Sequence, residues 1–425
     1  MTDKDSPSAR AAALDLLTAA LSGRSGLDEA LTSPALARLD PRDRAFARAL
    51  VLATLRRLGP IDRALDARLN RPPPAAVRNI LRLGAAQALV LRTPPHAAVG
   101  ESVDLAAAHR ETQGFKGLVN AVLRALLREP PDLDDPEALA PSWLFARWRA
   151  AYGEADARAV AAQIAEEPAT DLVFKDPADA ATLAAELEAE PLAGGGLRTR
   201  RRGDVSAWPG FGEGRWWVQD AAAAVPVRLL APRPGETALD LCAAPGGKTM
   251  QLAAAGAGVT ALDRAAARLV RVKENLARTG LSAESIVADA AAWSDPRRFD
   301  VVLLDAPCSA TGTFRRHPDV LWAARPGDIA SLVGVQTRLL DAAAGRVKPG
   351  GRLAYCVCSL EPEEGEAQMA AFLARHAEFA LTPIAAGEGG VPAASLRPDG
   401  TARILPHHLP GGADGFFIAR FIRSA

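Results

Sequence analysis

The stretch ALDLCAAPGGKTMQLA, residues 238–253, decides the fold of the larger part of this chain of 425 residues. It begins as a short apolar strand, turns at Gly246 and Gly247, and continues as a helix whose first N–H groups face the turn. Apolar strands and helical segments alternate from there onward, and strands are expected at 237–243, 259–263, 285–289, 299–305, 352–359 and 416–423. The last strand is expected to enter antiparallel, as an edge or an insertion. This alternation predicts a mostly parallel α/β sheet that binds ligands at the carboxyl ends of its strands.

Three ligands can be considered for the glycine turn. A mononucleotide P-loop would need a further glycine where Cys242 stands, and the dinucleotide fingerprint G-x-G-x-x-G is absent. S-adenosylmethionine suits the turn, because its amino-acid carboxylate can lie at a helix N-terminus without a full phosphate cradle. Asp263 ends the second strand, where it can accept hydrogen bonds from both ribose hydroxyls, and Asp289 ends the third strand within reach of adenine. Either acid alone could be a helix cap. With Asp305 at the end of the fourth strand, three successive acids favour S-adenosylmethionine as the cofactor.

Two further strand ends carry cysteines, Cys308 in DAPCSATGTFRRHPD (residues 305–319) and Cys358 in YCVCSL (residues 355–360). A thiolate is the nucleophile that proteins use against a weak electrophile. Methylation of cytosine would explain why two thiols lie near a methyl donor. Carbon 5 of cytosine accepts a methyl group only after a thiolate adds to carbon 6, and a base must then remove the hydrogen from carbon 5. Zinc is not expected, because Cys356 and Cys358 project to opposite faces of a strand and no C-x-x-C completes a metal site. If one of these two cysteines faces the site, the other belongs to the core.

The N-terminal third is helical and basic. Apolar residues recur at three- and four-residue spacing, and residues 1–130 hold 17 Arg and 2 Lys against 13 acidic residues, a net charge of +6. This charge fits a nucleic-acid partner, although an ordinary solvated helical surface carries as much. The Pro-rich segment 130–141 is interpreted as a linker or domain boundary, followed by helices to residue 167, a strand at 171–175 and a helix at 178–189. The densest basic run is either a solvated loop or an RNA contact, and it comprises Arg198, Arg200, Arg201 and Arg202.

The overall composition limits where the protein works. No run of about 18 uncharged apolar residues occurs, and the opening MTDKDSPSAR lacks the apolar segment of a secretory signal. We therefore expect a cytoplasmic protein with no membrane partner. Four cysteines in so long a chain argue against a disulfide framework, so any special role for them is chemical.

Taken together, these motifs resemble the Sun, or RsmB-type, 16S ribosomal RNA cytosine 5-methyltransferases. The helical third resembles a NusB-like domain in ILRLGAAQALVL, TPPHAAVGESVDLA and GLVNAVLRALLRE. The remainder resembles the family in VQDAAAAVPVRLL, DLCAAPGGKT, DAPCSATGTFRRHPD, YCVCSLEPEEGE and DGFFIARF, whereas DLVFKDPADA departs from the Arg- and Asn-bearing strand expected there. The resemblance implies a NusB-like RNA-binding domain at 1–130, linker helices and a small α/β middle domain at 131–205, and a Rossmann-like, seven-stranded methyltransferase domain at 206–425.

The resemblance also implies roles for individual residues. Cys358 would be the nucleophile and Cys308 would assist product release. Asp305 would be a third catalytic residue, in the region between the methyl donor and the base. Residues implied to bind S-adenosylmethionine, or to lie between it and the base, are Cys242, Ala243, Ala244, Pro245, Gly246, Gly247, Lys248, Asp263, Asp289 and Asp305. Residues implied to face RNA are Arg315, Arg316 and His317. No catalytic role falls to Cys356.

The expected activity is methylation of carbon 5 of a cytosine in ribosomal RNA or a small-subunit assembly intermediate, by a monomer. One alternative is the same chemistry on transfer RNA or another RNA. A DNA cytosine methyltransferase would instead use the Cys308 thiol as nucleophile and would need a target-recognition insertion for the major groove. A non-catalytic NusB-like RNA-binding protein would leave the cofactor turn and the cysteines without a role.

Overall fold

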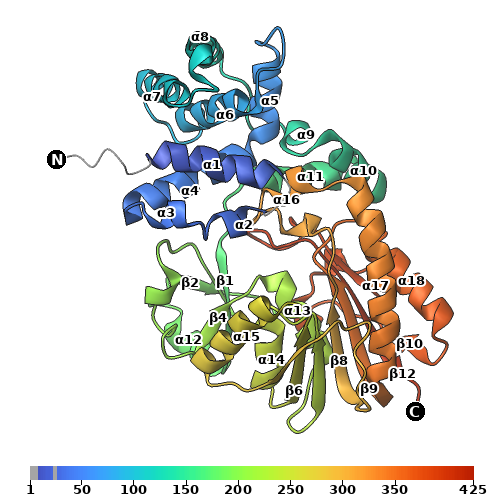
Figure 1. Cartoon of the computed structure of the whole chain (residues 1–425). Coiled ribbons are helices and arrows are strands. Elements are labelled where there is room, and N and C mark those ends of the chain that lie inside the picture. The colour runs from blue at the N-terminus through green and yellow to red at the C-terminus, as the bar shows by residue number, and fades with distance from the viewer. Residues whose placement is uncertain (1–7, 23–25) are drawn as a thin grey trace. The chain divides into compact units, whose positions relative to one another are not determined.

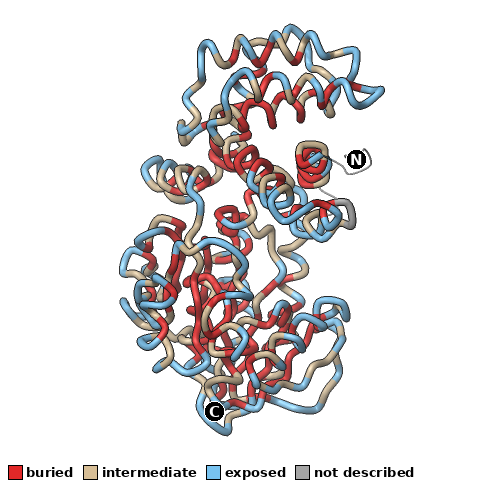
Figure 2. The backbone as a smooth tube through the Cα atoms, turned by 90° about the vertical axis from the view of Figure 1, so that its left-hand side faces the viewer, coloured by how far each residue is buried: buried red, intermediate tan, exposed pale blue. Residues whose placement is uncertain are grey.

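A computed structural model describes residues 8–22 and 26–425 and divides into two compact units, which we call the helical unit and the sheet unit. The helical unit comprises Met1–Glu167 and Phe314–Ala324, and the sheet unit comprises Pro168–Thr313 and Arg325–Ala425. Figure 1 labels most of their elements, and Figure 2 shows that each unit has a buried interior of its own. Within the described part of the chain, we find no helix with the length and apolar character needed to cross a membrane.

The helical unit is built from amphipathic helices, as predicted. α4 begins where the Asp40 side chain accepts a hydrogen bond from the backbone N of Asp43. Gly84 on α6 allows close packing, because a Cβ there would lie 2.5 Å from Ser102 Oγ and 2.7 Å from Leu123 Cδ1. The described helices are α1 Ala9–Ser22, α2 Gly26–Ala30, α3 Pro34–Ala37, α4 Pro41–Arg56, α5 Leu58–Asp66, α6 Ala75–Leu89, α7 Pro95–Ala108, α8 Lys116–Arg128, α9 Pro136–Leu139, α10 Ser142–Tyr152, α11 Glu154–Ala165 and α16 Val320–Ala323.

The main sheet of the sheet unit has the strand order β10-β12-β9-β8-β5-β6-β7, with the short β11 paired to β12. β5 to β9 are parallel, and β12 is inserted antiparallel between β9 and β10. The predicted strands 299–305 and 416–423 coincide with β8 and β12, and β10 and β11 were not predicted. The bounds are β5 Thr237–Leu241, β6 Gly258–Asp263, β7 Glu284–Val287, β8 Phe299–Asp305, β9 Val347–Val357, β10 Phe379–Leu381, β11 Ala402–Ile404 and β12 Phe416–Arg423. The predicted Rossmann-like methyltransferase fold is confirmed.

Helices cover both faces of this sheet, because its strands bury side chains on both sides. On one face, Ala238, Val301 and Ala354 pack in one apolar cluster with residues of α13. On the other face, Leu239, Val302 and Leu353 pack with residues of α17 and α18. The helices that follow the second, smaller sheet in this unit are α13 Ala221–Leu230, α14 Gly247–Ala254, α15 Ala266–Thr279, α17 Pro326–Arg346 and α18 Glu366–Arg375.

A second, antiparallel sheet of order β2-β3-β1-β4 precedes the main one. Its elements are β1 Thr170–Phe174, α12 Ala178–Leu183, β2 Ala189–Pro191, β3 Leu197–Thr199 and β4 Trp216–Val218, so the helix is shorter than predicted. Arg198 on β3 donates from Nε and Nη2 to the two carboxylate oxygens of Asp171 on β1, at 2.7 Å each. Its side chain is only 12% exposed. Arg198 therefore joins two strands, whereas Arg200 and Arg202 are exposed.

The unit boundaries differ from the predicted domain boundaries at 130 and 205. The Pro-rich segment is not a free linker, because Asp135 forms a 2.9 Å ion pair with Arg63 and caps α9. α9 to α11 belong to the helical unit, and so does the segment 314–324, whose Phe314 stacks on the buried Trp148 with ring centroids 5.9 Å apart. β1 to β3 belong to the sheet unit. Packing between segments distant in the sequence sets these boundaries.

Candidate active site

The predicted glycine turn lies at the carboxyl end of β5. The chain leaves this strand through Cys242, at φ +64°, and reaches Gly246 at φ +105°, a conformation that favours glycine. A Cβ at Gly246 would also lie 3.2 Å from Val272 Cγ1. α14 begins at Gly247, so its first backbone N–H groups lack partners within the helix and face the turn. This arrangement can receive a carboxylate.

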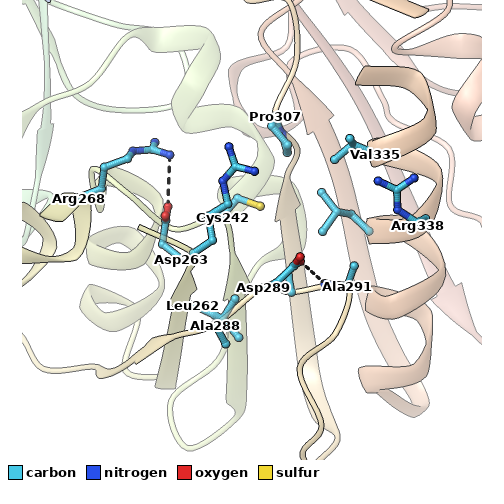
Figure 3. Close-up of a pocket in the computed structure, with 13 residues that line it drawn as sticks. Cys242, Leu262, Asp263, Arg268, Ala288, Asp289, Ala291, Pro307, Val335 and Arg338 are labelled. Atoms are coloured by element: carbon cyan, nitrogen blue, oxygen red, sulfur yellow. Dashed lines mark hydrogen bonds and ion pairs between the residues drawn. The ribbon is translucent and has the colours of Figure 1, made fainter. Parts of the chain in front are cut away.

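A pocket of about 170 Å³ opens beside the turn, at the ends of β6 and β7 (Figure 3). Asp263 lies in its wall and is 2% exposed. Its Oδ1 accepts a hydrogen bond from Ala265 N at 2.9 Å, and its Oδ2 accepts one from Ala244 N at 3.2 Å. Arg268 Nη1 lies 3.5 Å from Oδ2. Asp289, also in the wall, accepts a hydrogen bond from the backbone N of Ala291 at 3.0 Å.

The chemistry of this pocket fits S-adenosylmethionine. Much of its wall is apolar and suits a purine, with Leu262, Ala288, Ala290, Pro307, Val335 and Leu339 contributing to it. The Asp263 carboxylate has about four acceptor positions and uses two of them for backbone N–H groups, so it can also accept from ribose hydroxyls. Cys242 lines the pocket too, and burial, followed by the charges of Asp305 and Asp263, raises the pKa of its thiol to about 12. This cysteine therefore stays protonated at neutral pH.

Cys308 and Cys358 lie together at the ends of β8 and β9, with their Sγ atoms 3.5 Å apart. The hydrogen bond to Cys358, and after it burial, raises the pKa of the Cys308 thiol well above its usual value. Cys356 is fully buried, whereas Cys358 is partly exposed, in keeping with the alternation of strand side chains. Burial, followed by the charge of Asp305, raises the pKa of Cys356 well above its usual value. Cys308 and Cys356 are therefore thiols at neutral pH.

Lys248 was predicted to bind the cofactor, and the structure pairs it with Asp305. The Lys248 Nζ donates to Asp305 Oδ2 at 2.7 Å, and Cys356 Sγ donates to Asp305 Oδ1 at 3.5 Å. Burial lowers the pKa of Lys248, but the charge of Asp305 and the hydrogen bond to it act in the opposite direction, and the pKa is raised above its usual value. A fixed cation thus lies beside the thiols and a carboxylate. In the described residues no group of three or more His, Cys, Asp or Glu side chains could hold a metal ion.

The residues predicted to face RNA belong to the helical unit. Arg315 is only 2% exposed, and its backbone O accepts a hydrogen bond from Arg56 Nη2 at 2.7 Å. Arg316 is exposed, and His317 Nδ1 lies 3.3 Å from Asp28 Oδ2. Burial leaves the Arg315 side chain almost no surface for RNA in this conformation. RNA contact by these three residues stays a prediction.

The sequence motifs were not enough to identify Glu364, a buried residue that contacts both cysteine segments. The segment LEPEEGE was noted only as part of a resemblance. Its several acids look alike in the sequence, and Glu364 is distinguished only by the hydroxyl groups that surround it in the structure. One signal in the sequence could have pointed to such a residue: a serine directly follows each of the two cysteines, Ser309 after Cys308 and Ser359 after Cys358.

Comparisons with known proteins agree with this geometry. A family model described as 16S rRNA methyltransferase RsmB/F matches residues 227–422, and a NusB family model matches residues 7–128. Ribosomal RNA small subunit methyltransferase B of Cronobacter sakazakii is 37% identical over 409 residues, which cover 91% of this chain and 92% of that protein. The enzyme of the same name from Erwinia tasmaniensis is 38% identical over 403 residues, covering 90% and 91%.

Solved structures show the same relationship. The crystal structure of PH0851 has a TM-score of 0.78 at 26% identity and covers 96% of this chain and 98% of its own. A methyltransferase homolog protein from Pyrococcus horikoshii has a TM-score of 0.57 at 26% identity, covering 71% and 98%. The sequence identity to the two enzymes extends over nearly the whole of each chain, through both the NusB-like helices and the sheet that carries the paired cysteines. This chain therefore belongs to the RsmB/F family of 16S rRNA methyltransferases, whose methyl donor is S-adenosylmethionine.

Proposed function

We propose that this protein methylates carbon 5 of a cytosine in small-subunit ribosomal RNA, with Cys358 as the nucleophile and Cys308 as the residue that completes product release. The observation that carries the proposal is the 3.5 Å approach of the two Sγ atoms at the ends of adjacent parallel strands. Parallel strands end at the same edge of the sheet, so both thiols can reach one base. S-adenosylmethionine supplies the methyl group.

The first half of the reaction uses Cys358. Its thiolate forms a bond to carbon 6 of the flipped cytosine, and the electrons of the carbon 5–carbon 6 double bond move toward carbon 5 and the ring nitrogen. Asp305, which Lys248 holds at 2.7 Å, keeps a proton at the nitrogen edge of the ring and thereby favours the adduct. Bound S-adenosylmethionine would supply the methyl group to carbon 5 at this point, with S-adenosylhomocysteine as the other product.

The second half uses Cys308. In the resting pair its S–H lies at hydrogen-bond distance from Cys358, and that contact is the largest cause of its raised pKa. Once Cys358 is bonded to carbon 6 its sulfur is a thioether, a weak acceptor for the Cys308 S–H, so the largest cause of the raised pKa of Cys308 is removed and the thiol gives its proton to water more readily. The resulting thiolate removes the hydrogen from carbon 5, the carbon–sulfur bond breaks, and Cys358 leaves as a thiolate. The pairing therefore keeps the base protonated until the nucleophile has reacted.

The cofactor roles follow from the pocket beside the turn. We assign Asp263 to the ribose hydroxyls and Asp289 to the adenine edge, because both lie in the wall of the same pocket. The turn from Cys242 to Gly247 would receive the methionine carboxylate at the N-terminus of α14. Arg268, whose Nη1 lies 3.5 Å from Asp263 Oδ2, would be displaced from this ion pair by the ribose hydroxyls.

The substrate assignment is supported by the relatives, which are named as ribosomal RNA small subunit methyltransferases. The match of the helical unit to the NusB family and the net charge of +6 over residues 1–130 fit an RNA partner. We propose that the protein acts as a monomer on free ribosomal RNA or a small-subunit assembly intermediate. Mapping 5-methylcytosine in ribosomal and transfer RNA, with and without this protein, distinguishes these substrates.

Two matched cysteine variants test the mechanism. Cys358→Ser should form no covalent adduct and should not turn over, because a serine hydroxyl is a far weaker nucleophile than a thiolate at neutral pH. Cys308→Ser should still form the adduct but release it slowly, so an RNA–protein complex should accumulate on a denaturing gel. Cys356→Ser is the matched control: its hydroxyl can still donate to Asp305, so this variant should form the adduct and release it without accumulation. A trapped complex with Cys358→Ser and none with Cys308→Ser would favour the nucleophile of the DNA enzymes instead. Absence of methylation by the unchanged protein would favour a non-catalytic RNA-binding role.

A further inference from the structure

Glu364 has no role in the reaction described above, yet its side chain is completely buried in the segment between β9 and α18. Its Oε1 accepts hydrogen bonds from Ser309 N at 2.9 Å and Gln336 Nε2 at 3.1 Å. Its Oε2 accepts hydrogen bonds from Ser309 Oγ and Ser359 Oγ, both at 2.5 Å. One carboxylate therefore receives four hydrogen bonds, which is its full acceptor capacity.

These donors come from the two segments that carry the cysteines. Ser309 directly follows Cys308, and Ser359 directly follows Cys358. The carboxylate of Glu364 thus connects the chain beyond β8 to the chain beyond β9, one residue from each sulfur atom.

Two further contacts fix this connection in place. Gln336 on α17 also donates from Nε2 to the backbone O of Pro307, at 3.0 Å, next to the first cysteine. The hydroxyl of Tyr355 on β9 donates to the backbone O of Glu364 at 2.5 Å. Both the side chain and the backbone of Glu364 are therefore tied to the elements that present the thiols.

We propose that Glu364 is a positioning residue that holds Cys308 and Cys358 at reacting distance through the serine that follows each of them. Its catalytic consequence rests on the proposed function, whereas its effect on the distance between the two sulfur atoms does not. The pairing of β8 with β9 ends at Asp305 and Cys356, so it does not by itself fix the positions of Cys308 and Cys358, which lie beyond it. The carboxylate fixes the segments beyond those strands, where a displacement of about 1 Å can cost about 100-fold in rate.

Three substitutions test this role. Glu364→Ala removes all four acceptor positions, and Glu364→Gln keeps the length of the side chain but accepts fewer hydrogen bonds. Glu363→Gln is the matched control, because it removes the same charge from an exposed neighbour in the same segment. Circular dichroism and calorimetric binding of S-adenosylmethionine report whether each variant is folded.

Two readouts separate positioning from general structural support. In methylation of small-subunit ribosomal RNA, kcat should fall about 100-fold for Glu364→Ala and about 10-fold for Glu364→Gln, with KM for S-adenosylmethionine unchanged. With diamide as the thiol oxidant and no RNA present, the rate of Cys308–Cys358 disulfide formation, followed by mass spectrometry, should fall in the same order. Glu363→Gln should match the unchanged protein in both measurements.

The proposal is overturned if folded Glu364→Ala or Glu364→Gln forms the disulfide as fast as the unchanged protein does. It is also overturned if kcat is unaffected, or if KM for S-adenosylmethionine rises while kcat is preserved. Should Glu364→Ala fail to fold, the comparison of Glu364→Gln with Glu363→Gln decides. If the unchanged protein methylates no cytosine, the proposed function fails, but the disulfide rates still test the positioning.

Discussion

Replacing Asp263 by alanine should weaken binding of S-adenosylmethionine without unfolding the protein. In the structure its carboxylate holds the backbone N–H groups of Ala244 and Ala265, at 3.2 and 2.9 Å, and has Arg268 at 3.5 Å as an exchangeable partner. The ribose would replace Arg268 with charge-assisted hydrogen bonds, each of about 1.5–3 kcal/mol before the lost ion pair is subtracted. The net expected loss of binding free energy is about 1–3 kcal/mol, which corresponds to about a 5- to 150-fold rise in the Kd for S-adenosylmethionine.

Asp263→Asn sharpens the test. If its amide oxygen keeps the hydrogen bond from Ala265, its NH₂ group faces the backbone N–H of Ala244, and two donors then oppose each other. Asparagine should therefore bind no better than alanine does. Isothermal titration calorimetry measures Kd, and Glu274→Ala, on the exposed side of α15, is the control for loss of a charge. A rise in Kd below about 2-fold in folded Asp263→Ala would refute the ribose assignment. Tighter binding of ATP or NAD than of S-adenosylmethionine would refute the cofactor assignment.

Two further predictions concern stability. Burial raises the pKa of Asp240 to about 7 in the folded state, from near 4 in the unfolded state. Between these two pKa values the folded state binds more protons than the unfolded state does, so the free energy of unfolding falls as pH rises. Asp240→Asn should remove that fall, which denaturation by urea at pH 5 and pH 8 measures; an unchanged pH dependence would contradict the assignment. Arg56→Met should lower the unfolding free energy by about 1–3 kcal/mol, because Arg56 donates to the buried backbone O atoms of Arg315 and Ile164. The exposed Arg42→Met is its control, and equal melting temperatures of the two variants would contradict the expectation.

The fold was predictable because its signals are local. Strand periodicity and the glycine turn lie within short windows of sequence, and β8 and β12 begin and end where the pattern predicts. β10 and β11 were missed because three-residue strands carry too little periodicity to be recognised. The segment 130–141 contains α9 and the ion pair of Asp135 with Arg63, which its prolines and acids did not indicate, because such residues show only that regular structure is interrupted, not whether the segment packs.

The candidate site was predictable where residues adjacent in sequence form it. The turn from Cys242 to Gly247 depends on local backbone conformation, and the strand-end position of Asp263 follows from the βαβ alternation. The ion pair of Lys248 with Asp305 joins residues 57 positions apart, and no local pattern indicates it. The burial of Arg315 was likewise hidden, because its partner Arg56 lies 259 positions away.

By itself the sequence determined which side chains end the strands, since strand length and alternation are properties of consecutive residues. It thereby identified both thiols and the acids of the cofactor pocket as candidates. The tertiary structure alone decided which of them meet: the parallel register that pairs Asp305 on β8 with Cys356 on β9 brings Cys308 and Cys358 to 3.5 Å. It also decided that Glu364 joins their two segments and that 314–324 packs in the helical unit. The physical reason is that burial and hydrogen bonding act between neighbours in space, and residues 50 positions apart become neighbours only when the sheet has formed.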